Sequence, residues 1–194
     1  MDQALANQPS VRERILAAAY KLFAERGIGA TGIDAIVAES GCAKSSLYNN
    51  FESKEELALA FLQEREQVWT QGWLETAVRR RATTPDGRLL AIFDTFDEWF
   101  RRDDFEGCSF VNVLLESPKN SIVRAAAADH LANIRDMVQG FAEQAKLVKP
   151  EVFASAWHML MKGSIVSAGE GNREAAVEAR RAGQLLIDGW ARSW

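Results

Sequence analysis

Cysteine and histidine are scarce in this chain. Two cysteines, Cys42 and Cys108, and two histidines occur among 194 residues. Two cysteines so far apart in sequence form no disulfide framework and are typical of a reducing compartment. Two histidines without acidic side chains at ligand spacing give no support for a metal site. We therefore expect neither a metal nor another cofactor.

Long uncharged hydrophobic runs are also missing. The first ten residues, MDQALANQPS, contain no apolar leader segment, and no later stretch is long and uncharged enough to cross a bilayer. We therefore expect a cytoplasmic protein with no membrane partner.

The chain also lacks an excess of positive charge. The formal net charge is −4, and residues 1–54 carry six basic and six acidic side chains. The total charge therefore does not indicate a nucleic-acid partner, and such a function must depend on where single cations lie. Lys44 and Lys54 fall at predicted helix N-termini, where the helix dipole and the cation can hold a phosphate together.

The period-two alternation of strands is absent too, so we predict an all-α fold. Ser10 with Glu13 and Ser53 with Glu56 are capping boxes, Thr31 with Asp34 is a weaker version, and Thr84 can cap the helix that Pro85 begins. Apolar spacing and these caps predict helices over residues 11–26, 53–81, 85–102, 109–116, 120–147, 150–168 and 173–194, with two short helices between residues 31 and 50.

Residues 31–56 have the layout of a helix-turn-helix: a short helix, a glycine turn at Gly41, a second short helix and the capped start of a third. Ile36 and Val37 give the first of these helices an inward face, and Cys42, Leu47 and Phe51 supply apolar contacts on the far side of the turn. The side chains left outward are of the types that bind phosphates and base edges, namely Lys44, Ser45, Ser46, Tyr48, Asn49 and Asn50.

RERILAAAYKLFAERG, followed by TGIDAIVAESG and LYNNFESKEEL, resembles the N-terminal domain of the TetR (tetracycline-repressor-like) transcriptional regulators over roughly residues 10–59. The rest of the chain resembles the family in length and helical character. The resemblance implies a helix-turn-helix DNA-binding domain in residues 1–54 and a helical effector-binding and dimerisation domain in residues 55–194.

The resemblance also implies roles for single residues. Residues 44–50 would form the recognition helix, Tyr48 and Lys54 would hold phosphates, and Thr31 would anchor the preceding helix to the DNA backbone. Ser45, Ser46 and Asn49 are the candidates for reading bases. Two positions depart from the family pattern, because Ser45 stands in place of a usual glycine and Asn50 in place of a usual histidine.

Residues 55–194 hold more aromatic side chains than a small helical core needs. They could pack the core or line a site for a small-molecule effector. Such sites are typically lined by many apolar side chains and few polar groups. The candidate walls are Trp69, Trp73, Phe93, Phe96, Trp99, Phe100, Phe110, Trp157 and Met161, with Asn112, Glu116 and His158 as polar anchors.

The last two predicted helices mix small residues with large apolar ones along one face. That face could be intramolecular core or a two-fold interface, and the resemblance favours the interface, since these regulators typically dimerise through their last two long helices. The candidate dimer residues are Phe153, Leu160, Ser164, Ala168, Ala176, Ala179, Gly183, Ile187 and Trp190.

These observations lead to three hypotheses about the function of the chain. The first is a ligand-responsive regulator, most often a repressor in the family, that binds a pseudo-palindromic operator in double-stranded DNA as a homodimer and is released by a small, largely apolar or aromatic effector. An enzyme using Cys108 or His158 would lack a paired base and an orienting third group, so we predict no enzymatic activity. The alternative to ligand sensing is a DNA-binding regulator that senses oxidants through Cys108.

Overall fold

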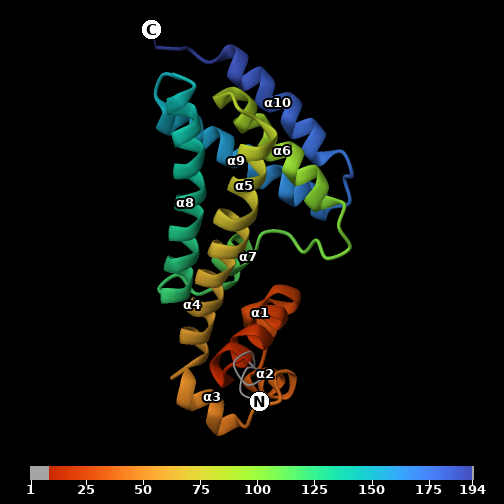
Figure 1. Ribbon diagram of the computed structural model, residues 1–194, viewed down its shortest axis with the longest axis vertical. Coiled ribbons are helices and arrows are strands. Elements are labelled where there is room, and N and C mark those ends of the chain that lie inside the picture. The colour runs from red at the N-terminus through yellow and green to blue at the C-terminus, as the bar shows by residue number, and fades with distance from the viewer. Residues whose placement is uncertain (1–8, 194) are drawn as a thin grey trace, which may run out of the picture. The chain divides into compact units, whose positions relative to one another are not determined.

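The computed structural model describes residues 9–193, which form helices joined by short turns (Figure 1). These residues contain no strand beyond one isolated bridge between Leu147 and Arg192, so the predicted all-α fold is confirmed. The chain divides into two compact units. The first ends at Glu64 and also includes Ser109–Ala128, and the second comprises Arg65–Cys108 and the residues from Asp129 onward.

This division differs from the boundary predicted at residue 54. The first unit gains most of the helix that follows the helix-turn-helix, together with a distant segment that packs on the first helix. Sequence spacing shows where helices begin and end, but not which distant helix covers a given face. A functional division at residue 54 stays a prediction.

The first unit contains α1 (Val11–Ala30), α2 (Ile33–Ser40), α3 (Lys44–Asn50), most of α4 (Lys54–Arg65) and α7 (Ser109–Glu116). Its core is formed by apolar side chains from each of these helices, and the Phe61 ring lies edge-on to the rings of Tyr20 and Phe23 at 5.3 and 5.5 Å between centroids. The predicted capping box at Ser10 is confirmed, because the Ser10 hydroxyl accepts from the Glu13 N–H and the Glu13 carboxylate accepts from the Ser10 N–H.

Two start signals behave differently from the prediction. Thr31 does not cap α2, whose N-cap is Gly32 without a side-chain hydrogen bond. At Ser53 the hydroxyl does accept from the Glu56 N–H, but the Glu56 carboxylate accepts from the N–H of Glu52 instead of the Ser53 N–H. The second capping box is therefore formed with its return bond shifted by one residue.

The second unit contains η1 (Glu66–Glu75), α5 (Thr76–Arg81), α6 (Pro85–Phe100), most of α8 (Ile122–Gln144), α9 (Pro150–Gly169) and α10 (Ala175–Gly189). The central helix is α6, which packs against α5, α9 and α10. Its start is as predicted, with the Thr84 hydroxyl accepting from the Gly87 N–H and Pro85 in the first turn.

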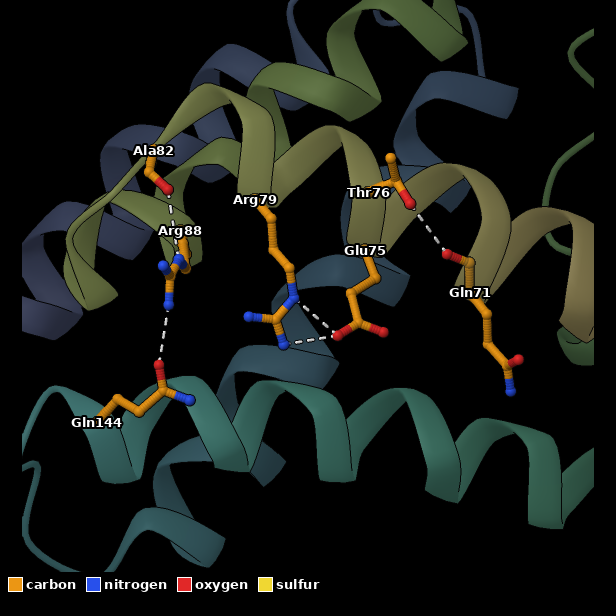
Figure 2. A network of polar contacts seen from close by, with 7 residues as sticks. All are labelled: Gln71, Glu75, Thr76, Arg79, Ala82, Arg88 and Gln144. Atoms are coloured by element: carbon orange, nitrogen blue, oxygen red, sulfur yellow. Dashed lines mark hydrogen bonds and ion pairs between the residues drawn. The ribbon is translucent and has the colours of Figure 1, made fainter.

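The helix predicted over residues 53–81 is continuous but not uniform. Its middle, η1, is π-helical over ten residues, with α-helix on either side. Such stretches are rare and are frequently found at functional sites. Just after this stretch, the side-chain hydroxyl of Thr76 donates to the carbonyl of Gln71, five residues earlier, at 3.3 Å (Figure 2).

Polar contacts join the end of this long helix to the elements around it (Figure 2). Arg79 holds the Glu75 carboxylate with two nitrogens, at 2.6 and 2.9 Å. Arg88 of α6 donates to the Ala82 carbonyl and to the side-chain oxygen of Gln144 on α8. Among the described helices, none combines the length and the apolarity needed to span a membrane.

Candidate nucleic-acid interface, aromatic cluster and dimer face

The short helix α3 is held on the first unit by its apolar residues. Leu47 is fully buried, Phe51 at its C-terminal end is 1% exposed, and Ile36 of α2 is fully buried. The Arg12 guanidinium lies over the Phe51 ring at 4.6 Å from its centroid. These contacts fix which side of α3 faces outward.

The turn between α2 and α3 requires glycine. Gly41 has a φ of 62° in the left-handed region, where a residue with a Cβ is strained. A Cβ at this position would also lie 3.2 Å from Nη2 of Arg14, the atom that donates to the carbonyls of Ser40 and Gly41. The turn is therefore fixed by backbone conformation and by α1 together, as the sequence predicted for Gly41.

The outward side of α3 carries four exposed polar side chains: Lys44, Ser45, Tyr48 and Asn49. Two further members of the predicted set are half-buried, and one of these, Asn50, donates through its side-chain nitrogen to the Ser46 carbonyl at 2.8 Å. Lys54, at the start of α4, is half-buried as well. The face available to a ligand from outside is therefore narrower than the sequence pattern alone suggests.

Thr31 was included with the DNA contacts, and the structure places it elsewhere. Its side chain is buried, with 1% of the residue exposed, and its hydroxyl hydrogen-bonds to the carbonyls of Leu22 at 3.1 Å and Gly27 at 2.8 Å. The residue closes the C-terminal end of α1, where Gly27 interrupts the helix with a φ of 79°. A hydroxyl committed to these carbonyls is not offered to a phosphate, so we leave Thr31 out of the contact set.

Acidic side chains hold the cations of the helix-turn-helix. Lys44 Nζ lies 2.8 Å from Oδ1 of Asp34 on α2, and Lys21 Nζ lies 2.7 Å from Oε1 of Glu39. The hydrogen bond to Asp34 raises the pKa of Lys44 above its ordinary value. Asp34 was predicted as part of a weak cap, and its proximity to Lys44 could not be found from spacing because the two residues lie on different helices.

In the second unit, six aromatic rings form one cluster, which we call the Trp69 cluster: Trp69, Trp73, Phe96, Trp99, Phe100 and Phe105. Neighbouring ring centroids lie between 4.9 and 6.2 Å apart, mostly in edge-on or tilted arrangements. Phe105 was not among the predicted walls, although its aromatic type and its closeness in sequence to Phe100 were a signal.

Four other predicted pocket residues of this unit belong to the interior. Phe93 and Trp157 are fully buried, with their rings tilted against each other at 5.2 Å between centroids, and Met161 is 2% exposed. His158 is 4% exposed, and burial, with the positive charges of Lys162 and Arg135, lowers its pKa to about 4. A histidine kept neutral in this way contributes to the core at neutral pH.

The remaining predicted pocket residues, Phe110, Asn112 and Glu116, lie on α7 in the first unit. Glu116 lies over Gly27 of α1, where a Cβ would be 2.8 Å from its carboxylate, and Asn112 is exposed. These three residues therefore belong to a different compact unit from the Trp69 cluster. Among the described residues no group of His, Cys, Asp and Glu could hold a metal ion.

A surface cavity of about 450 Å³ lies where α6 ends beside the turn between α9 and α10. It is lined by Phe100, Arg101, Ala168, Gly171, Asn172 and Arg173. Phe100 is its one predicted ligand-binding residue, and Arg101 is held by Asp97 at 2.8 Å. This polar rim does not match the apolar effector site that the sequence predicted.

The predicted dimer residues lie mostly inside a single chain. Phe153, Ala176 and Ile187 are at most 1% exposed, Ser164 and Ala179 are 5% exposed, and Gly183 is buried, while Leu160, Ala168 and Trp190 are half-buried. The small residues of α10 bring it close to the large rings of α6 and α9: a Cβ at Gly183 would lie 2.7 Å from the Trp157 ring. The buried members of this set therefore support the intramolecular alternative, and a dimer contact through the half-buried Leu160, Ala168 and Trp190 stays a prediction.

Large apolar residues are exposed on one side of α9 and at one position of α10. Val152, Met159 and Val166 of α9 are 49%, 64% and 55% exposed, and Leu185 of α10 is 74% exposed. The three α9 residues are spaced by seven, so they share one face of the helix. We call these four residues the α9–α10 apolar stripe. Its spacing is visible in the sequence, but sequence alone does not show which of two apolar faces the core covers.

Comparisons with known proteins place this geometry in a family. Residues 15–61 match the model of the bacterial regulatory proteins of the tetR family. The chain is 37% identical to the HTH-type transcriptional activator FasR of Mycolicibacterium smegmatis over 94 residues, which is 47% of this chain and 41% of FasR. It is 30% identical to the HTH-type transcriptional repressor DhaR of Mycobacterium sp. strain GP1 over 115 residues, 59% of this chain and 56% of DhaR.

The chain thus spans about half the length of the curated relatives it matches. The structural likeness is longer. A crystal structure of a TetR-family transcriptional regulator from Streptomyces coelicolor is 26% identical, superposes with a TM-score of 0.85, and the match covers 96% of this chain and 93% of that one. The relatives compared are regulators, in agreement with the prediction that the chain is not an enzyme. The helix-turn-helix of the first unit thus belongs to the TetR family of bacterial regulatory proteins, and the chain as a whole has the fold of a TetR-family transcriptional regulator.

Proposed function

We propose that this chain works as a homodimer that reads a pseudo-palindromic DNA operator with α3, represses transcription there, and is released by a small, largely apolar effector bound in the second unit. The observation that carries the proposal is the outward face of α3. Lys44, Ser45, Tyr48 and Asn49 are exposed, while Leu47 and Phe51 fix the helix from behind.

The four exposed side chains, with Lys54, divide by chemistry. The cations Lys44 and Lys54 and the hydroxyl of Tyr48 suit phosphates, and the shorter Ser45 and Asn49 suit base edges in the major groove. Half-buried Ser46 and Asn50 are weaker candidates for contact. Phosphate contacts position the helix, and base contacts give the sequence preference.

A second copy of α3 is needed for useful affinity, since one helix of seven residues has few contacts to offer. Two copies related by a two-fold axis can read major grooves about 34 to 36 Å apart. We assign the dimer contact to the α9–α10 apolar stripe, because its four large apolar side chains are exposed in the single chain. The buried face predicted from sequence is not available for this purpose.

The effector would act by favouring a dimer geometry in which the two α3 helices no longer match the groove spacing. A coupling of about 1 to 3 kcal/mol, or 5- to 150-fold in operator affinity, is typical of such regulation. An oxidant sensor at Cys108 is less well supported, because that residue is 7% exposed and its sulfur offers little access to an oxidant. Cys108→Ser should therefore leave regulation intact.

The test is binding of the purified protein to duplexes taken from around its own coding region, followed by fluorescence anisotropy against random duplex at physiological salt. We expect one duplex to bind at least about a thousandfold more tightly than random DNA. Asn49→Ala should reduce that ratio, whereas Asn120→Ala, an exposed asparagine of the same unit away from α3, should not. Equal binding to all duplexes would overturn the proposal.

A further inference from the structure

Two neighbouring polar groups on η1 are buried without a hydrogen-bond partner among the described residues. They are the indole Nε1 of Trp69 and the hydroxyl of Thr70, a residue that is 5% exposed. More than nine in ten buried polar groups in proteins are paired, so two orphans at adjacent positions need an explanation. Trp Nε1 is only a donor, so its missing partner is an acceptor.

Other residues of the same types in this chain do find partners. Thr95 on α6 donates to the Ala91 carbonyl at 2.8 Å, the usual bond for a helical threonine, and Thr76 reaches the Gln71 carbonyl. The Trp190 indole donates to the Val148 carbonyl at 2.6 Å. The orphans at Trp69 and Thr70 therefore differ from these paired residues, and they are adjacent on one element, whereas the other orphaned indole, that of Trp157, lies on α9.

The aromatic surroundings of Trp69 offer stacking faces next to the orphaned groups. Trp73 and Trp99 lie 5.3 and 5.0 Å from Trp69 between ring centroids, and Phe96 lies at 6.2 Å. Phe96 and Trp99 are buried, whereas Trp69 and Trp73 keep part of their surface exposed. The partly exposed rings of Trp69 and Trp73 therefore give a planar molecule a surface to stack on at the residues that carry the orphaned groups.

Three carboxylates near this cluster in sequence already have partners. Glu66 accepts from His130 and from the side-chain nitrogen of Asn133, Glu75 is held by Arg79, and Asp97 by Arg101. The buried Glu64 Oε2 on α4 has none among the described residues. A neutral ligand with an acceptor oxygen satisfies the two donors without breaking the three existing pairs.

A third orphaned donor serves as an internal reference. The Trp157 indole Nε1 is also unpaired, but Trp157 is fully buried between Phe93 and Phe153, with Gly183 against its ring. A ligand could reach it only by opening the core. Trp157 is therefore a control residue: its indole is unpaired like that of Trp69, but a ligand cannot reach it.

We propose that η1 carries the effector site, with the Trp69 indole and the Thr70 hydroxyl as its hydrogen-bond donors, and that the effector is a neutral planar aromatic molecule bearing a carbonyl oxygen. The rings of the Trp69 cluster stack on the ligand, and the two donors bind its oxygen. This assignment deepens the proposed function and takes its regulatory meaning from it.

The test uses two probes of similar shape, coumarin and naphthalene, which both have two fused six-membered rings but of which only coumarin carries a carbonyl oxygen. Binding to the full-length protein is measured by ligand-observed NMR titration. We expect coumarin to bind at least about tenfold more tightly, since buried donors reject a ligand that leaves them unpaired. Failure of coumarin to bind at millimolar concentration, or equal binding of the two probes, overturns the proposal.

Three variants locate the donors. Trp69→Phe and Thr70→Val keep the ring and the shape while removing the hydrogen-bonding groups, and each should reduce the preference for coumarin to about threefold or less. Trp157→Phe is the matched control and should keep the full preference. Loss of preference in Trp157→Phe, or its survival in the other two, overturns the assignment, and Thr70→Val remains informative if Trp69→Phe does not fold.

The test of the effector site and the test of the proposed function can fail independently. Operator binding is measured on the same samples without either probe. A protein that prefers coumarin but no DNA sequence would overturn the regulator and leave the site standing, whereas sequence-specific DNA binding without a coumarin preference would overturn the site alone.

Discussion

At the scale of single residues, the ion pair between Asp34 and Lys44 limits what α3 offers to a phosphate. Both side chains are exposed, so the pair itself adds little stability, but it must be opened or shared when a phosphate approaches. The Asp34 carboxylate also repels the phosphate. We therefore expect the Asp34–Lys44 pair to lower the affinity for DNA of any sequence and to leave the folding stability nearly unchanged.

We predict that Asp34→Asn increases affinity for operator and random DNA alike and steepens the salt dependence by about one unit of log–log slope, because Lys44 is then available to a phosphate. Anisotropy titrations at several salt concentrations measure both quantities. The comparison variant is Glu39→Gln, which breaks the Lys21–Glu39 pair on the same domain and should have a smaller effect. An unchanged slope in Asp34→Asn would show that Lys44 does not contact phosphate.

The buried His158 makes stability depend on pH. Its pKa is lowered to about 4, so between that value and 6.5 the unfolded chain binds a proton that the folded chain does not. Its contribution is fully present above pH 6.5 and is lost as the pH falls toward 4, by up to roughly 3 kcal/mol of unfolding free energy.

The measurement is urea denaturation between pH 7.5 and 4. We expect His158→Gln to show a shallower fall in unfolding free energy over this range than the natural chain, whatever its stability at neutral pH. His130→Gln, which changes the contact to Glu66, provides the comparison. Parallel curves for the natural chain and His158→Gln would contradict the assignment.

At the scale of elements, the contact between α10 and the interior depends on a missing side chain. Gly183 lies where a Cβ would be 2.7 Å from the Trp157 ring and 3.2 Å from the Phe93 ring. Both rings are fully buried and held by their own neighbours, so they have little freedom to move away.

We therefore predict that Gly183→Ala lowers the unfolding free energy by about 1 to 3 kcal/mol, because overpacking outweighs the gain in helix propensity. Gly140→Ala in α8, where a Cβ meets nothing within 4 Å, should be neutral or stabilising. Chemical denaturation of both variants decides the matter. A stabilised Gly183→Ala would mean that α10 can shift away from α6 without loss.

The elements were predictable where the signal is local. Ser10 with Glu13, and Thr84 with Pro85, begin helices as expected, because a cap depends on residues within one turn. The π-helical η1 was not foreseen, since its hydrogen bonds depend on packing that spacing does not encode. The same limit explains Thr31: a hydroxyl before a helix can cap that helix or close the preceding one, and only the fold decides.

The candidate site was predictable to a similar degree. The exposed face of α3 follows from the positions of Leu47 and Phe51, which the apolar pattern showed. Both faces of α9 are apolar, so the pattern could not show that Phe153 is inside and Met159 outside. Partners on other helices, such as Asp34 for Lys44, required coordinates.

At the scale of the whole molecule, the proposed dimer contact at the α9–α10 apolar stripe leads to a prediction about the oligomeric state. We predict that Met159→Asp combined with Leu185→Glu converts the dimer to a monomer. The free energy needed to bury two unpaired carboxylates in an apolar interface exceeds the free energy gained from the contact. Sedimentation velocity measures the change, and operator binding should weaken with it. Leu115→Glu, a residue of α7 that is 73% exposed, is the control that should stay dimeric. A dimeric double variant would place the interface elsewhere.

The paired lysines of the helix-turn-helix also bear on how such a regulator finds its target. A genome presents about 10⁶ to 10⁹ competing sites, and every spare cation lengthens the stay on each of them. With Asp34 and Glu39 beside Lys44 and Lys21, we expect each encounter with arbitrary sequence to be shortened. Since the operator is affected to the same degree, the ratio of the two affinities stays with the base contacts, and the ion pairs set how quickly the protein moves from one site to the next.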